Sequence, residues 1–289
     1  MNYQVTIGIS FKNPGELFQL TLQSVFAQTF SNWELILIDD GSTDYSLALA
    51  KSIKDERVRV YSDGESKGLN VRLNQMIQLA KTPYFFRMDA DDIMHPQRLE
   101  KQYQLLLQND EDTVIGTAAY SIDSNSCIVG FRPSRQNQKL GFDARHSFLH
   151  PTVAAPTIWF RKNSYSNNFI YNRSQDAELW CRTTSKTKFI NLPEPLLFYR
   201  EVGTFSFDNY LGTSLGLLHI IYNKFNQPLQ KYIYLFTREM LKLWFVFILT
   251  NFNLSNYLIS RRYKLLSHQE IEDANVALTI INQQKLPID

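Results

Sequence analysis

The sequence predicts an α/β fold in which a mostly parallel sheet carries helices on both faces, followed by a helical C-terminal extension. Short apolar runs alternate with helix-like segments through residues 1–204, which is typical of a parallel sheet. Two of these runs end abruptly in carboxylates, at Asp39 and at Asp89. Beyond them, the chain becomes rich in aromatic and basic residues. We therefore expect one domain over 1–204 and a helical region over 205–289.

Hydrophobic periodicity places the individual elements. The side chains of Phe18, Leu22 and Val25 fall on one helical stripe. The apolar run 157–160 is predicted to be a strand, and Ser174 is predicted to be the N-cap of the next helix. We further expect strands at 4–11, 34–38, 57–61, 84–88 and 113–118, and helices at 43–54, 70–80 and 96–108.

Composition excludes several classes of protein. The 289 residues are 44% hydrophobic and 20% charged, as in a globular protein. A net charge of +2 gives no reason to expect a nucleic-acid partner. Cys127 and Cys181 have no paired spacing, so neither a disulfide framework nor a zinc site is predicted. The first residues lack the pattern of a signal peptide, and we expect a cytoplasmic protein.

Three carboxylates, Asp89, Asp91 and Asp92, come directly after the predicted strand 84–88. Residues two apart in an extended chain share a face, so Asp89 and Asp91 point the same way. Their charges repel each other unless a cation or hydrogen-bond donors lie between them. The alternative is a solvated loop in which Asp92 caps a helix that begins at Pro96.

A second acidic cluster, Asp39 to Asp44, comes after the predicted strand 34–38. Ligands bind beyond the carboxyl ends of the strands in an open α/β sheet, so both clusters are expected at one place. The alternative for this cluster is a turn and a helix cap, a role that suits Asp44 best.

Two later segments carry further candidates. His150 lies in a loop-like segment and is a candidate ligand contact, although most histidines are hydrogen-bonded packing groups. Asp176 lies in the first turn of a predicted helix, where the helix dipole alone favours a carboxylate.

Four segments in this order resemble the family 2 glycosyltransferases of the GT-A fold. They are Asp-Asp-Gly-Ser at 39–42, Arg-Met-Asp-Ala-Asp-Asp at 87–92, His-Pro-Thr at 150–152 and Gln-Asp-Ala-Glu-Leu-Trp at 175–180. The resemblance extends over about residues 3 to 200, and it includes the lead-in Gln-Thr-Phe-Ser-Asn-Trp-Glu at 28–34 that is typical of bacterial members.

The resemblance implies an inverting, metal-dependent transferase with a nucleotide-sugar donor, for which a UDP-sugar is expected. It implies that Asp176 is the catalytic base, and that Asp91 with Asp89 holds Mn²⁺ or Mg²⁺. The implied nucleotide-sugar contacts are Asp40, Asp39, Asp89, Ser10 and Arg87, with Asp40 bonded to the base. His150, Gln175 and Arg200 are candidate contacts to the acceptor or donor.

The residue types suit this chemistry independently of the resemblance. A leaving diphosphate develops negative charge that a divalent cation on one or two carboxylates can stabilise. One further carboxylate is sufficient as the general base of a single displacement with inversion. A glycosidase is less favoured, because acids two apart on one strand suit a shared ion better than opposed roles across a sugar ring.

The chain also departs from the family. The first loop reads Lys-Asn-Pro-Gly at 12–15 in place of the usual Pro-Thr-Tyr-Asn, which leaves its nucleotide contacts open. No histidine comes shortly after Tyr199-Arg200, where Glu201 stands, and the Gln-x-x-Arg-Trp motif of processive synthases is absent. We therefore expect one sugar to be added at a time.

Two other functions stay open at this stage. A nucleotidyltransferase would carry a Gly-rich loop with several basic residues after the first strand, whereas residues 10–15 hold only Lys12. A non-catalytic sugar-nucleotide-binding module would be marked by loss of Asp91 or Asp176, and both are present.

The region 212–264 contains seven Lys or Arg residues and the single acid Glu239, among many aromatic residues. Its longest apolar run, 243–249, is too short to cross a bilayer. One interpretation is a helical subdomain that packs on the core or forms a homodimer. The other is peripheral contact with anionic lipid on the inner face of the plasma membrane, near a lipid-linked acceptor. The expected acceptor is a saccharide or lipid-linked saccharide in capsule or lipopolysaccharide synthesis.

Overall fold

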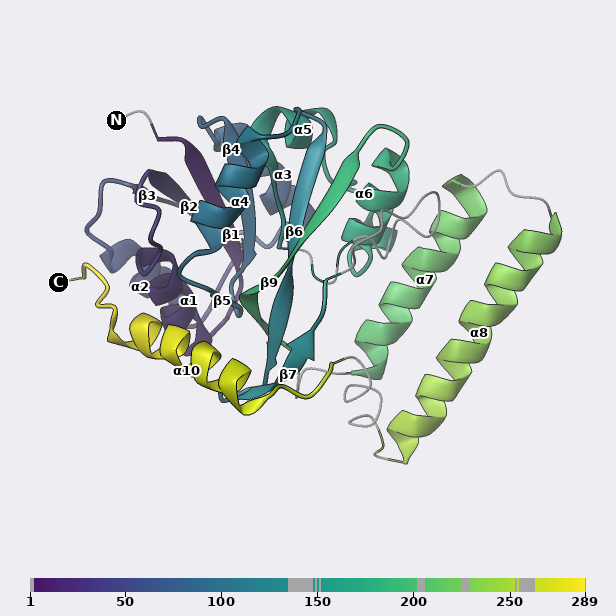
Figure 1. Ribbon diagram of the computed structural model, residues 1–289. Helices are drawn as coiled ribbons and strands as arrows, with labels where there is room; N and C mark the ends of the chain where they lie inside the picture. Colours follow the sequence, from purple (N-terminus) through teal and green to yellow (C-terminus); the bar gives the residue numbers. More distant parts are fainter. Residues whose placement is uncertain are drawn as a thin grey trace.

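The computed structural model describes residues 3–134, 148, 150, 152–201, 206–224, 229–252, 254 and 263–288. Within these residues the chain forms a curled nine-stranded sheet with helices on both faces, which confirms the predicted fold class (Figure 1). The strand order is β3-β2-β1-β4-β8-β6-β9-β5, and β7 pairs with β6 outside this path.

The first half of the sheet is parallel, as the sequence predicts. It consists of β1 (Val5–Phe11), β2 (Trp33–Asp39), β3 (Val58–Tyr61) and β4 (Tyr84–Asp89). In the central strand, Ser10 is in register with Ile38 of β2 on one side and with Asp89 of β4 on the other. This register brings the acids that end β2 and β4 to either side of the end of β1.

The second half of the sheet has mixed directions. It consists of β5 (Ile93–Met94), β6 (Thr113–Ile122), β7 (Ile128–Arg132), β8 (Ala154–Pro156) and β9 (Lys188–Arg200). The strands β6 and β9 are parallel, whereas β8 is antiparallel to both β4 and β6. The parallel pairs thus form two blocks that the short strand β8 joins.

Two hydrophobic cores separate the helices into layers. On one face, α1 (Leu17–Phe26), α2 (Ser46–Ser52) and α4 (Arg98–Leu107) bury residues such as Phe18, Leu22 and Leu99 against the sheet. On the other face, α3 (Leu69–Leu79), α5 (Thr157–Lys162) and α6 (Gln175–Thr183) bury residues such as Met76, Trp159 and Trp180. The predicted helices over the first 108 residues are therefore all present, some with shorter bounds.

The prediction of a strand at 157–160 is wrong, because these residues begin the helix α5. A short apolar run has no periodicity that separates a buried strand from a buried helix turn. Here Thr157, Trp159 and Phe160 face the core while Ile158 is exposed, and the strand β8 ends one residue earlier at Pro156. The indole of Trp159 donates to the hydroxyl of Thr187 at 3.0 Å, which fixes the ring inside the core.

The C-terminal helices occupy two separate places. The helices α7 (Phe207–Lys224) and α8 (Leu229–Asn251) lie side by side, and α7 packs on α6 and the short 3-10 helix η2 (Phe169–Tyr171) (Figure 1). The helix α10 (His268–Gln283) instead packs on α1 and the sheet. The region predicted as one extension is thus divided between an outer helix pair and a helix of the domain core. No helix among the described residues has the length and apolar character of a membrane span.

Candidate active site

The acids after β2 are held by the loop that precedes α3. The carboxylate of Asp40 accepts hydrogen bonds from the backbone N–H of Lys67 at 2.7 Å, from that of Gly68 at 3.1 Å and from the hydroxyl of Ser66 at 3.1 Å. The buried guanidinium of Arg72 donates to the same carboxylate at 2.9 Å. Burial opposes ionisation, but these hydrogen bonds outweigh it and lower the pKa of Asp40. Asp40 therefore fixes the loop 66–68.

The neighbouring acid Asp39 has a similar role. Its carboxylate accepts from the backbone N–H of Ser42 and from the hydroxyl of Ser62, each at 2.9 Å. This arrangement agrees with the turn expected for the segment, and it ties β2 to the segment after β3. The carboxylates of Asp39 and Asp40 are thus both engaged by the protein itself.

The unusual first loop is bonded to the same turn. The side-chain oxygen of Asn13, which has a positive φ of 49°, accepts from the backbone N–H of Thr43 at 2.7 Å. The backbone N–H of Gly15 donates to the Asp44 carboxylate at 3.0 Å, so Asp44 acts in the turn as predicted. The ammonium group of Lys12 donates to the hydroxyl of Ser66 at 2.9 Å. The cationic side chain of Lys12 thus lies next to the loop 66–68 that Asp40 holds.

A buried arginine connects the acids of β4 with the helix α6. Arg87 is 1% exposed, and its guanidinium donates to Asp89 at 3.2 Å and to Asp176. It also donates to the hydroxyl of Tyr165 at 3.3 Å. The structure therefore brings together Asp89 and Asp176, two predicted site residues 87 positions apart in the chain.

Asp176 is a partly accessible acid, since its side chain is 22% exposed. Burial raises the pKa of Asp176, and the positive charge of Arg87 counteracts this effect. The hydroxyl of Ser174, at the N-cap of α6, makes no capping hydrogen bond to the helix. A carboxylate that is accessible, oriented and partly desolvated has the properties of a general base.

Asp91 differs from Asp39 and Asp40 in the groups around its carboxylate. Among the described residues, no other side chain donates a hydrogen bond to its carboxylate, whereas its backbone carbonyl accepts from Arg200 at 2.9 Å. Burial, and to a lesser degree the charge of Asp89, raises the pKa of Asp91. An acid in this environment is stabilised as an anion when a cation binds beside it.

The predicted helix-capping role of Asp92 is wrong. The helix α4 has Gln97 at its N-cap and no side-chain cap. Asp92 is buried and accepts from the backbone N–H of Arg200 at 2.9 Å. It therefore joins the end of β4 to the end of β9.

The residues present fit a hard divalent cation. No three His, Cys, Asp or Glu side chains come together as ligands within the described ranges. Mg²⁺ and Mn²⁺ commonly bind to one or two carboxylates and complete their coordination with phosphate oxygens and water. Asp91 and Asp89 offer such oxygen atoms at the end of β4.

The three remaining candidate residues are His150, Gln175 and Arg200. The two ring nitrogens of His150 lie 3.2 Å from the Thr117 carbonyl and 2.5 Å from the Thr152 hydroxyl, and burial lowers the pKa of this histidine well below its usual value. His150 thus has the environment of a packing group. Gln175 begins α6 and is buried, and its side-chain oxygen has no partner among the described residues. Arg200 donates to Asp91, Asp123 and Ser126.

Two side chains that sequence analysis did not single out shape the site. Tyr165 packs beside the Arg87 guanidinium, with 5.5 Å between the guanidinium carbon and the ring centroid. Arg72 donates both to Asp40 and to Asp63, the latter at 2.6 Å. Neither residue lies in a motif, and only the tertiary fold shows their partners.

Residues 6–180 match the family model described as Glycosyl transferase family 2. The chain belongs to this family. The match covers the strands and helices that carry all the candidate acids, from β1 to α6.

Similar proteins agree with this assignment. The chain is 32% identical over 192 residues to the O-antigen biosynthesis glycosyltransferase WbnJ of Escherichia coli, covering 63% of this chain and 73% of the relative. It is 30% identical over 129 residues to WfgD of E. coli, a UDP-Glc:alpha-D-GlcNAc-diphosphoundecaprenol beta-1,3-glucosyltransferase, covering 45% and 50%. The crystal structure of S. aureus TarS 1-349 with UDP-GlcNAc has a TM-score of 0.60 at 14% identity, with 82% of this chain and 71% of TarS covered, which supports the GT-A fold.

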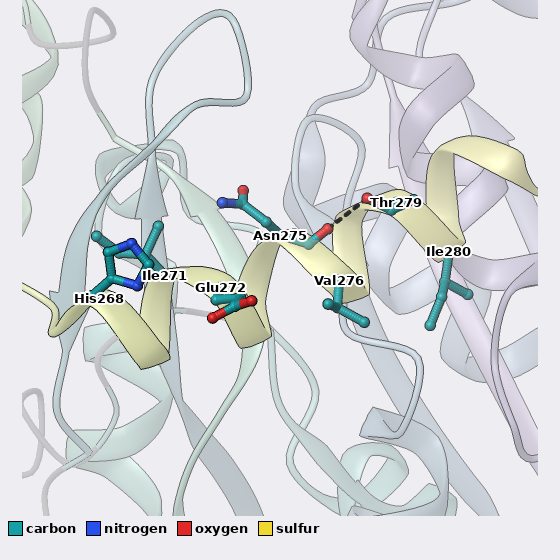
Figure 2. Close-up of a pocket in the computed structure, with 7 residues that line it drawn as sticks. All are labelled: His268, Ile271, Glu272, Asn275, Val276, Thr279 and Ile280. Atoms are coloured by element: carbon teal, nitrogen blue, oxygen red, sulfur yellow. Dashed lines mark hydrogen bonds between the residues drawn. The ribbon is translucent and has the colours of Figure 1, made fainter.

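A shallow hollow on this glycosyltransferase lies on the outer surface of α10, away from the candidate site acids (Figure 2). Figure 2 shows that its lining comes from this one helix, with the hydroxyl of Thr279 bonded to the carbonyl of Asn275. His268 and Glu272 are its titratable groups, and none of the candidate site residues lines it. We assign no chemistry to this surface.

Proposed function

We propose that this glycosyltransferase moves a single sugar from a UDP-sugar to an acceptor hydroxyl, with inversion and with the help of Mn²⁺ or Mg²⁺. The observation that carries this proposal is the bridge from Asp89 through buried Arg87 to Asp176. It holds an acid of the candidate metal site and a candidate base on two sides of one place. A metal-bound leaving group and an activated acceptor could meet there.

The donor nucleotide would bind where β1 and β2 end. Lys12 and the loop 66–68 border this place, and Ser10 lies on β1 in register with Asp89. Because the Asp40 carboxylate already accepts from this loop, we propose that Asp40 acts on the nucleotide base by shaping the loop. The names of the relatives favour UDP, since WfgD uses UDP-Glc and TarS has been crystallised with UDP-GlcNAc.

Asp91 and Asp89 would hold the divalent ion. When bound, the ion supplies positive charge beside the diphosphate that leaves. Arg200 supports this arrangement by its hydrogen bond to the Asp91 carbonyl, which fixes the turn between β4 and β5. We therefore assign Arg200 a positioning role.

Asp176 would take the proton of the acceptor hydroxyl. Arg87 orients its carboxylate and favours the anion, and the exposed part of the side chain admits an acceptor. One carboxylate on the far side of the sugar is sufficient for a single displacement, so the product would have the opposite anomeric configuration to the donor.

The acceptor would be a saccharide or a lipid-linked saccharide of the cell surface. WbnJ acts in O-antigen biosynthesis and the name of WfgD specifies a diphosphoundecaprenol acceptor, which supports lipopolysaccharide or capsule synthesis as the setting. A screen of nucleotide sugars with Mn²⁺ would identify the donor.

The Asp176→Asn variant tests the mechanism. Asn can still accept a hydrogen bond from Arg87 but cannot take a proton, so nucleotide affinity should stay unchanged while the rate falls by roughly 10²- to 10⁴-fold. Calorimetry with UDP, single-turnover kinetics and NMR of the product anomer measure the three quantities. Asp112→Asn, a change at an exposed acid outside the site, is the matched control. Near wild-type turnover of Asp176→Asn, or retention of configuration, would contradict the proposal.

A further inference from the structure

The helix α8 carries more large exposed apolar side chains than any other described helix. Leu241 is 66% exposed and Trp244 is 63% exposed, although both are large apolar residues in the middle of a 23-residue helix. Further exposed apolar residues on the outer face of α8 are Ile233, Tyr234, Met240 and Phe245. Contiguous apolar patches of this kind mark interaction sites on proteins.

These residues are not buried against the described part of the chain. The inner face of α8 buries Leu235, Val246 and Leu249, and α7 lies along this side (Figure 1). The helix α8 is therefore apolar on two faces, and only one of them has a partner among the described residues. An apolar stripe that continues onto the outer face indicates an external partner.

The charges of this segment favour one class of partner. Glu239 accepts from Arg238 at 3.2 Å and from Lys242 at 3.0 Å, so two cations share one carboxylate on α8. Over 212–264 the sequence has seven basic residues and this single acid. An aromatic-rich apolar face beside Arg238 and Lys242, in a segment with this basic excess, suits the interface of a bilayer that contains anionic lipid. A symmetric dimer through the same face would instead bring the cations of both copies together.

We infer that the outer face of α8 binds to the surface of an anionic lipid bilayer, with the helix lying in the plane of the interface. An in-plane orientation agrees with the absence of a membrane-spanning helix among the described residues. This inference goes beyond the proposed reaction and does not depend on it.

The helix α8 is connected to the candidate active site through a shared apolar cluster. Ile220 and Ile221 of α7 pack in one cluster with Cys181 of α6 and Leu235 of α8, and α6 carries Asp176. Two layers of helix packing thus separate the candidate base from the proposed membrane contact. A lipid-linked acceptor would be delivered from this side, a consequence that does rest on the proposed function.

Tryptophan fluorescence provides a direct test on the full chain. Of the four tryptophans, Trp33, Trp159 and Trp180 are at most 2% exposed, whereas Trp244 is 63% exposed. Vesicles of phosphatidylcholine and phosphatidylglycerol should shift the emission to the blue, and brominated lipids should quench it. In Trp244→Phe both signals should disappear while the protein still sediments with the vesicles. Unchanged emission of the wild type at saturating vesicles would overturn the inference.

A pair of matched double variants locates the contact. Leu241→Gln with Trp244→Gln removes two exposed apolar side chains from α8, so co-sedimentation with anionic vesicles should fall by about 10-fold or more. Val276→Gln with Ile280→Gln makes the same kind of change on α10, where the side chains are 56% and 49% exposed, and should leave binding unchanged. Both variants should keep the wild-type melting temperature. Equal loss of binding in the two variants would contradict the assignment to α8.

The dependence of binding on salt and on lipid charge distinguishes binding to a membrane from binding to a second copy of the chain. Binding should weaken between 0.1 and 1 M salt, as the screening length falls from about 10 Å to about 3 Å, and should be weaker on neutral vesicles. If light scattering instead shows a dimer that Leu241→Gln with Trp244→Gln converts to a monomer, and anionic vesicles capture nothing, the face belongs to a homodimer and the inference is wrong.

Discussion

The acids after β2 and the acids after β4 lie on either side of β1, but they differ in the groups that surround their carboxylates. Asp40 accepts hydrogen bonds from two backbone amides, a serine and a buried arginine, and its pKa is lowered. Among the described residues, no other residue's amide, hydroxyl or guanidinium donates to the Asp91 carboxylate, and its pKa is raised. The same residue type at equivalent strand ends is therefore part of the scaffold in one cluster and available to a ligand in the other.

The difference arises from the segments that pack beside each strand end. The loop before α3 turns back at Gly68, whose φ of 89° favours glycine, and presents amides to Asp40. The turn after β4 is instead held by Arg200, which donates to the backbone carbonyl of Asp91 and not to its carboxylate. Backbone donors thus decide the role of an acid as much as its position does.

The largest effect is expected at Asp91. If its carboxylate holds the metal ion, Asp91→Asn should abolish turnover and weaken metal-dependent UDP binding by about 100-fold, which is about 2.7 kcal/mol. Isothermal titration with UDP and Mn²⁺ measures this change, and titration without metal is the control. EDTA should abolish wild-type turnover and Mn²⁺ should restore it. Full activity after removal of divalent ions would contradict the assignment of Asp91 as a metal ligand.

A smaller effect of another kind is expected at Asp40. Asp40→Ala leaves Arg72 buried with fewer partners, so the free energy of unfolding should fall by about 3 kcal/mol. Asp40→Asn keeps one acceptor oxygen and should lose less. Urea unfolding measures both variants without substrate. If Asp40→Ala unfolds like the wild type but no longer binds UDP, the carboxylate contacts the nucleotide directly and the comparison fails.

The sequence predicts the positions of the acids better than it predicts the groups that surround them. The strand ends, the acids and the family can be inferred from local patterns, and the structure and the comparisons confirm the fold and the family. The bond from Arg87 to Asp176 joins residues 89 positions apart, and the clamp of Arg72 on Asp40 depends on how a loop turns. Such partners have no local signal. The helix α5 shows the same limit, since the apolar run 157–160 is too short to show a helical period.

The smallest effect concerns His150, whose ring nitrogens both have protein partners. Its pKa is lowered in the folded chain, so below about pH 6.5 the unfolded chain takes up a proton that the folded chain does not. Stability is therefore lost as the pH falls, by at most about 1.4 kcal/mol per pH unit from this group. Partly buried His95, with a pKa of about 4, acts in the same direction.

The variant His150→Gln isolates this contribution. Its unfolding free energy should be lower than that of the wild type at pH 7, but should decline less steeply between pH 6.5 and pH 5. Urea titrations at several pH values give both slopes. If the unfolding free energies of the two proteins change with pH at the same slope, His150 takes up a proton in the folded chain. It would then again be a candidate for contact with a ligand.

The position of α10 has a consequence for how the chain acquires its structure. The side chain of Gln23 in α1 donates to the carbonyl of Gln284, 261 positions later, and the amide of Lys54 donates to Pro287 at 2.6 Å. During synthesis, Ile93, Tyr120 and Phe198 stay uncovered until Ala277 and Ile281 emerge from the ribosome. Contacts of such long range slow folding and leave apolar surface accessible to aggregation or to chaperones. Removing residues 268–288 should therefore lower the yield of folded enzyme, although no candidate catalytic residue lies within them.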